Sequence, residues 1–206
     1  MVNEQVAKVF DRTQAQCGRI LDAAEQCFIK FGFHAASMST IAEAAGMSPG
    51  LIYRYFDNKS AIIKAIIERQ LCTLRADMAT LQSGADFTSM IADLFASWQR
   101  GDPRGMSPVL YLELTAEATR DDAIADACKM SDDVCGSALR AWLKQQAKAE
   151  GHELTDIEAE QSEIAVRCFI DGLALRAVRD PELRPALVAA SLQRFLPTLL
   201  AIPRSR

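Results

Sequence analysis

Residues 38–57 read MSTIAEAAGMSPGLIYRYFD, and this stretch decides how the chain is expected to fold. Apolar residues recur at helical spacing on both sides of Gly46, and Pro49 stands where the first turn of a second helix accepts a proline. Glycine suits a tight turn because it has no side chain to clash. The residues suited to a small core shared by both helices are Ile41, Ala45, Met47 and Ile52, and the small Ala42 lets the helices cross closely. The stretch therefore predicts a helix-turn-helix, with a plain helical hairpin as the competing interpretation.

The second helix of this pair, expected to run from Pro49 to about Phe56, combines an apolar side with unusual surface chemistry. Ile52 and Phe56 are four residues apart and are expected to face inward together. This leaves the following residues at or near the outer surface: Gly50, Leu51, Tyr53, Arg54 and Tyr55. Tyrosine hydroxyls and the nearby Lys59 can bond phosphate oxygens, and Arg54 can reach guanine edges or phosphate. The pattern predicts a helix that reads DNA.

The remainder of the chain is also expected to be helical, because apolar residues recur every three or four positions without strand-like alternation. A helix before the quoted stretch carries an apolar stripe and stops at Gly32. Thr40 and Glu43 have capping-box spacing, and Asp57 or Asn58 can cap the long helix that follows. The later helices are expected over residues 57–81, 87–100, 107–118, 121–149, 156–179 and 182–201. The fold class is therefore all-α.

Composition indicates an ordinary globular protein of 206 residues, 50% hydrophobic and 24% charged, with a net charge of −4. The charge is uneven: residues 1–70 carry eight Lys/Arg and seven Asp/Glu, whereas residues 71–206 carry fifteen and twenty. An acidic body does not prevent a local surface from binding phosphates. No apolar run of about 18 residues and no secretory signal is visible. A cytoplasmic protein without a membrane partner is expected.

The residues that support catalysis or metal binding are sparse. The six cysteines show no CxxC pair and are expected to be free, buried thiols, although Cys128 and Cys135 leave a redox role open. The two histidines, His34 and His152, lie far apart in sequence. No nucleophile with a matching base, Glu-x-x-His pair or phosphate loop appears. An enzyme on a helical bundle is thus the less favoured class, and no catalytic residue, metal or cofactor is predicted.

Residues of about 15–62 resemble the DNA-binding domain of the TetR family of transcriptional repressors. The matching stretches are RILDAAEQCFIKFGF, STIAEAAGMSPGLIYRYF and NKSAII. The resemblance implies a three-helix helix-turn-helix domain in residues 1–60, with a flexible arm at 1–14. It implies that a long fourth helix joins this domain to a C-terminal helical bundle, residues 61–206, for ligand binding and dimerisation.

The same resemblance assigns DNA contacts. Ser37 stands where the family usually has a threonine that bonds phosphate, and Lys59 matches a phosphate-binding lysine. The recognition-helix positions are occupied by Ser48, Gly50, Leu51, Tyr53, Arg54 and Tyr55. Two positions depart from the family pattern: Ser39 replaces a frequent arginine, and Leu51 replaces the common threonine. Leu51 can still touch a thymine methyl group.

The resemblance further implies a homodimer that binds a palindromic double-stranded DNA operator and is released by a small-molecule effector. The last two long helices are expected to form the dimer, because they are apolar over more than one face. The candidate ligand residues, each of which also suits an ordinary core or an ion pair, are Phe95, Trp98, Tyr111, Glu113, Phe169 and Asp171. They predict a lipophilic effector, with Glu113 or Asp171 as partner for a positive charge. A helix-turn-helix factor without an effector is the alternative.

Overall fold

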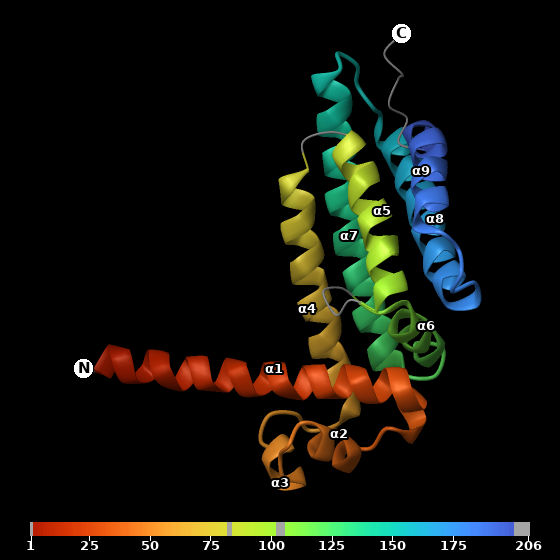
Figure 1. Ribbon diagram of the computed structural model, residues 1–206. Coiled ribbons are helices and arrows are strands. Elements are labelled where there is room, and N and C mark those ends of the chain that lie inside the picture. The colour runs from red at the N-terminus through yellow and green to blue at the C-terminus, as the bar shows by residue number, and fades with distance from the viewer. Residues whose placement is uncertain (1, 82–83, 102–105, 200–206) are drawn as a thin grey trace. The chain divides into compact units, whose positions relative to one another are not determined.

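The computed structural model describes residues 2–81, 84–101 and 106–199, in which α-helix is the regular secondary structure (Figure 1). The helices are α1 (Val2–Ala35), α2 (Met38–Ala44), α3 (Pro49–Ile52), α4 (Lys59–Thr80), α5 (Gly84–Arg100), α6 (Pro108–Glu117), α7 (Asp122–Ala149), α8 (Asp156–Arg179) and α9 (Pro185–Leu199). None of the helices in these ranges combines the length and apolar character needed to cross a membrane. The expected all-α fold is confirmed for the described residues.

The chain forms two compact units, and both differ in extent from the expected domains. The first comprises Met1–Arg69 and Glu113–Cys128, and the second comprises Gln70–Leu112 and Lys129–Arg206. The first unit therefore follows α4 beyond residue 60, and it also takes in the end of α6 and the start of α7. These additions come from a part of the sequence in which no motif indicates a link to the helix-turn-helix.

Helix α1 is longer than predicted and breaks at the predicted glycine. It continues back to Val2, so helix occupies the positions expected to form an arm. Its buried stripe includes Ile20, Ala24 and Phe28, which fits the apolar spacing of the sequence. At Gly32 the backbone adopts φ 76° and ψ 164°, a conformation essentially restricted to glycine, and the helical path is interrupted there.

The two short helices follow the predicted helix-turn-helix core but differ at their ends. Ile41 and Ile52 are fully buried, and Gly46 makes the turn at φ 64°. Ser37 caps α2 by accepting the Thr40 N–H at 3.0 Å, so the predicted capping box starting at Thr40 is wrong. The caps are therefore serines in both helices, because Ser48 accepts the Leu51 N–H at 3.3 Å in α3.

Helix α3 is shorter than the predicted helix to Phe56. After Ile52 the backbone tightens, with the Tyr55 N–H bonded to the Ile52 carbonyl three residues earlier. Phe56 still faces the core, and its N–H bonds to Ile52 O at 3.0 Å. The inward pair Ile52 and Phe56 is therefore confirmed although the regular helix ends sooner. Asn58 then caps α4 by accepting the Ala61 N–H at 2.9 Å.

The second unit has its own apolar core, in which α5 packs against α8 and α9. The buried residues of this core are Phe87, Ile91, Phe95, Leu139, Trp142, Leu143, Val166, Leu173, Val188, Leu192 and Leu196. Phe87 and Trp142 stack with their rings 5.1 Å apart. The core thus joins helices that are far apart in the sequence but lie side by side in the unit (Figure 1).

The cysteines are free, but the expectation that they are buried is wrong for most of them. Cys27 is buried, Cys72 and Cys168 are exposed, and the others are intermediate. Cys168 is exposed because it lies on an outward face of α8, where helical periodicity alone does not reveal which side meets solvent.

Candidate DNA-binding site

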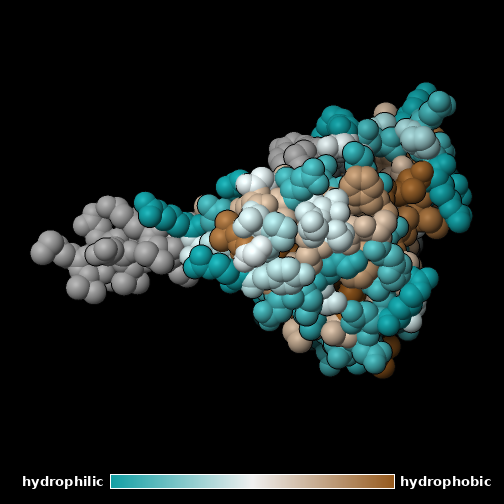
Figure 2. Space-filling model, turned by 90° about the horizontal axis from the view of Figure 1, so that it is seen from below, coloured by the Kyte–Doolittle hydropathy of each residue, from teal (hydrophilic) through white to brown (hydrophobic). Residues whose placement is uncertain are grey.

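The surface of α3 and the turn after it carries the predicted recognition residues. Tyr53 is 53% exposed, and Gly50 and Arg54 are exposed, whereas Leu51 and Tyr55 are half-buried. A Cβ at Gly50 would meet no atom within 4 Å, so the backbone is open to a close partner there. Figure 2, seen from below Figure 1, shows a face on which hydrophilic and near-neutral side chains are mixed with hydrophobic ones. The arrangement suits contact with a polar groove.

The three serines predicted to contact DNA are all exposed: Ser37, Ser39 and Ser48. Two of their hydroxyls cap helices, and the Ser37 hydroxyl also lies 2.8 Å from Thr40 Oγ1. A hydroxyl has one donor and two acceptor positions, so a cap that accepts an N–H can still donate to a phosphate oxygen. Their geometry is therefore compatible with the predicted contacts.

Lys59 has internal partners that the sequence did not indicate. Its ammonium donates to Phe33 O at 2.7 Å and to His34 O at 3.4 Å, and it lies 4.4 Å from the centre of the Phe33 ring. Burial lowers the pKa of Lys59, while the nearby Glu117 carboxylate acts in the opposite direction. The side chain thus holds the start of α4 against the end of α1.

A row of acids fixes the same corner of the first unit. Glu113, Glu117 and Asp121 recur every four residues and so lie on one side of the chain. Glu113 Oε2 accepts the Phe33 N–H at 3.1 Å, and Glu117 Oε2 lies 3.2 Å from His34 Nε2. Asp121 accepts the Ser60 hydroxyl at 2.9 Å, and this bond is the main reason that its pKa is lowered. Glu113 therefore has a structural partner in the first unit, the kind of role that the sequence left open beside the ligand role.

The other predicted ligand residues lie in the second unit. Phe95 is fully buried, and Trp98 and Phe169 pack against the same core. Trp98 also donates its indole N–H to Met106 O at 3.0 Å. Tyr111 donates its hydroxyl to Asp171 Oδ1 at 2.7 Å. The structure thus brings two polar candidates together and packs the three aromatic ones at the core.

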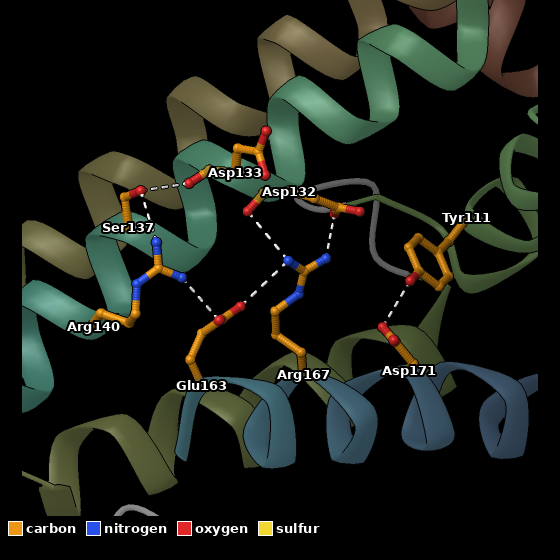
Figure 3. A network of polar contacts seen from close by, with 8 residues as sticks. All are labelled: Tyr111, Asp132, Asp133, Ser137, Arg140, Glu163, Arg167 and Asp171. Atoms are coloured by element: carbon orange, nitrogen blue, oxygen red, sulfur yellow. Dashed lines mark hydrogen bonds and ion pairs between the residues drawn. The ribbon is translucent and has the colours of Figure 1, made fainter. Parts of the chain in front are cut away.

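Tyr111 and Asp171 stand beside a chain of charged contacts between α7 and α8 (Figure 3). Arg167 contacts the Asp132 carboxylate at 2.5 Å and Glu163 Oε1 at 3.4 Å. Arg140 binds the other oxygen of Glu163 at 2.9 Å. Glu163 is buried, so two arginines compensate the cost of burying its charge.

Close approach of the two helices makes this network possible. A Cβ at Gly136 on α7 would lie 2.7 Å from Glu163 Oε1, a separation that real side chains do not show.

Burial raises the pKa of Tyr111, and the bond to Asp171 acts in the same direction. Burial also raises the pKa of Asp132, although Arg167 opposes it. The sequence signal that pointed here was the pair of acids interrupting apolar runs, of which Asp171 was one.

Comparison with known proteins identifies the family. Residues 20–66 match the bacterial regulatory proteins of the tetR family, and residues 88–201 match the C-terminal region of BetI-type transcriptional repressors. The second match alone spans more than half of the chain. The chain belongs to the tetR family of bacterial regulatory proteins.

Individual relatives agree with this TetR assignment. The HTH-type transcriptional regulator TtgR of Pseudomonas putida is 24% identical over 196 residues, which cover 86% of this chain and 87% of TtgR. The HTH-type transcriptional regulator UidR of Escherichia coli is 34% identical over 111 residues, 52% of this chain and 54% of UidR. Both are described as transcriptional regulators rather than as enzymes.

Solved structures share the TetR fold. Salmonella enterica GusR superposes with a TM-score of 0.73 at 26% identity, covering 91% of this chain and 96% of GusR. FadR from Bacillus subtilis, solved in complex with stearoyl-CoA, superposes with a TM-score of 0.68 at 21% identity, covering 90% and 98%. The resemblance read from the sequence is thereby confirmed: the chain is a TetR-family, DNA-binding transcription regulator with a helix-turn-helix.

Proposed function

We propose that this TetR-family regulator is a dimeric repressor that binds a palindromic operator through α3 and releases it when a small lipophilic effector binds. The observation that carries the proposal is the surface of α3 and the turn after it, where Tyr53 and Arg54 are exposed and the backbone is open at Gly50. Arginine is suited to the guanine edge, and tyrosine to phosphate. The regulator would act on DNA in the cytoplasm.

Exposed apolar residues on the last two helices support the dimer. They are Ile157, Ile164, Leu175 and Val178 on α8, with Leu187 and Phe195 on α9. The intervals on α8 of 7, 11 and 3 residues place its four on one side of the helix. A surface of this kind is stabilised when a second copy covers it, and a two-fold axis then presents two copies of α3 to the two halves of a palindrome.

The effector site is proposed for the second unit. Phe95, Trp98 and Phe169 would supply the apolar wall, and the bonded pair Tyr111 and Asp171 would supply a polar end. Glu113 is omitted from the site because its carboxylate accepts the Phe33 N–H in the first unit. The stearoyl-CoA bound by FadR has a long apolar chain, which supports a lipophilic class of effector here.

The test begins with DNA fragments selected from the genome by the wild-type protein, with binding followed by fluorescence anisotropy. Arg54→Ala is expected to weaken binding at least tenfold, whereas Arg100→Ala, an exposed arginine on α5, should leave it unchanged. Equal effects of the two variants would contradict recognition through α3.

Release is tested on the same complex with acyl-CoA, lipophilic cations and neutral aromatic compounds. We expect one class to release the DNA, and its potency to change in Asp171→Asn or Tyr111→Phe. Release that both substitutions leave unchanged would remove the polar pair from the site. No release by any class would favour the alternative, a helix-turn-helix factor without an effector.

A further inference from the structure

A groove lies in the first unit between α1 and α3, with a volume of about 550 Å³. Its lining residues are Arg12, Thr13, Gln16 and Arg19 from α1, Gly46 and Met47 from the turn, and Leu51 and Tyr55 from α3 and the turn after it. In Figure 1, α3 lies beneath the middle of α1, which agrees with these two walls. The groove thus shares two residues with the predicted recognition surface.

The chemistry of the groove suits an anion. Arg12, Gln16 and Arg19 are spaced by four and three residues, so they form one stripe along α1. The eight lining residues include two arginines and no acid. Arginine, threonine, glutamine and tyrosine side chains are all donors commonly used to bind DNA phosphates. A negatively charged, elongated partner is therefore favoured over an apolar one.

Arg19 is held in place in this wall. One of its terminal nitrogens donates to Ala45 O at 2.7 Å, and the other lies 3.4 Å from Gln16 Oε1. A guanidinium has five N–H donors, so these bonds leave donors for another acceptor. Arg12, seven residues earlier on the same side of α1, is exposed at the rim. Both arginines are exposed, and the groove therefore combines one cation held by hydrogen bonds, Arg19, with a second, Arg12, two turns away on the same side of α1.

We propose that a phosphodiester segment of the operator lies in this groove, so that α1 is part of the DNA interface together with α3. This inference rests on the proposed DNA-binding function and adds the strand-positioning surface to it. Because phosphates carry no base information, the contacts of Arg12 and Gln16 would raise affinity for all sequences and fix the register of α3.

A matched pair of substitutions tests the inference. Gln16→Glu puts a negative charge in the groove, whereas Gln14→Glu makes the same change at an exposed position outside its lining and on the opposite side of α1. We expect Gln16→Glu to weaken operator binding at least tenfold more than Gln14→Glu, as measured by anisotropy. Thermal unfolding followed by circular dichroism checks that both variants remain folded.

Salt dependence supplies the second readout. Arg12→Gln should reduce the slope of log affinity against log salt by about 0.9, the effect of losing one phosphate contact, on the operator and on a random duplex alike. If the wild type binds DNA, but Gln16→Glu and Gln14→Glu bind with equal affinity and Arg12→Gln keeps the wild-type salt slope, the groove inference is wrong while the proposed function stands. If the wild type binds no DNA, the proposed function and the groove inference are both wrong.

Discussion

Gly32 shows how a single residue determines the path of α1. Its φ of 76° is in the region that favours glycine, and an added Cβ would lie 3.4 Å from Glu113 Oε2. Gly32→Ala is therefore expected to lower the free energy of unfolding by about 1–3 kcal/mol, measured by urea denaturation. Gly18→Ala is the control, since Gly18 lies within the same helix with open space around it. This change should raise the free energy of unfolding by about 0.5–1 kcal/mol. The same loss in both variants would contradict the backbone argument.

Tyr111 provides a titration that reports on the α6 to α8 contact. Its raised pKa means that the folded protein favours the protonated phenol. The associated stabilisation is complete below the ordinary tyrosine pKa of about 10, and is lost as pH rises through the raised value. The difference between the alkaline absorbance titrations of wild type and Tyr111→Phe should show a phenol that ionises above pH 10. If the phenol that is lost in Tyr111→Phe ionises at or below about pH 10, the bond to Asp171 is contradicted.

At the scale of elements, Glu163 holds α7 and α8 together through Arg140 and Arg167. Breaking a buried ion pair from one side typically costs about 3–5 kcal/mol. Here the two arginine side chains are 35% and 31% exposed, so solvent screens them in part. We therefore expect Glu163→Gln to lower the free energy of unfolding by about 2–3 kcal/mol, as measured by urea denaturation. Glu160→Gln, an exposed change on the same helix, should stay within about 0.5 kcal/mol. Equal stability of the two variants would show that the network contributes little.

Helix ends were predicted from the sequence where the signals that set them are local. Helix α8 runs over the predicted residues 156–179 because Thr155 and Glu158 form a capping box at its start. Helix α3 ends earlier than predicted because its hydrogen bonds change to a tighter turn after Ile52, a choice that apolar spacing does not reveal. In α2 the true cap, Ser37, precedes the Thr40 that spacing had suggested.

Contacts between distant residues lay beyond prediction from sequence. Glu113 and Phe33 are separated by 80 residues, so an acid that interrupts an apolar run was interpreted as a ligand partner. Lys59 was predicted to contact phosphate from its chemistry and from the resemblance, and the carbonyls at the end of α1 are additional partners that the sequence did not indicate. The exposure of Gly50, Tyr53 and Arg54 on α3 and the turn after it was predicted correctly, because the inward pair Ile52 and Phe56 fixes the remaining surface. Local periodicity thus indicates which face of a helix is buried, whereas tertiary packing determines the hydrogen-bond partners of its side chains.

For the molecule as a whole, the proposed dimer depends on the exposed side of α8. Ile164→Glu places a charge among its apolar residues, and burying an unpaired charge is costly. We expect the wild type to be a dimer at micromolar concentration and Ile164→Glu to be a monomer, as measured by size-exclusion chromatography with light scattering. Met130→Glu is the control because Met130 is also exposed but lies on α7. A monomeric wild type that still binds one operator tightly would contradict the dimer.

Selection of duplexes from a randomised pool, with wild type and Arg54→Gln, tests whether two copies of α3 read a palindrome. We expect an inverted repeat whose half-sites are centred about 34–36 Å apart, or a multiple of this distance. We also expect Arg54→Gln to lose about 1–3 kcal/mol of base preference at symmetric positions in both halves. Selected sequences without an inverted repeat, or with base preferences that the substitution leaves unchanged, would contradict recognition of a palindrome by two copies of α3.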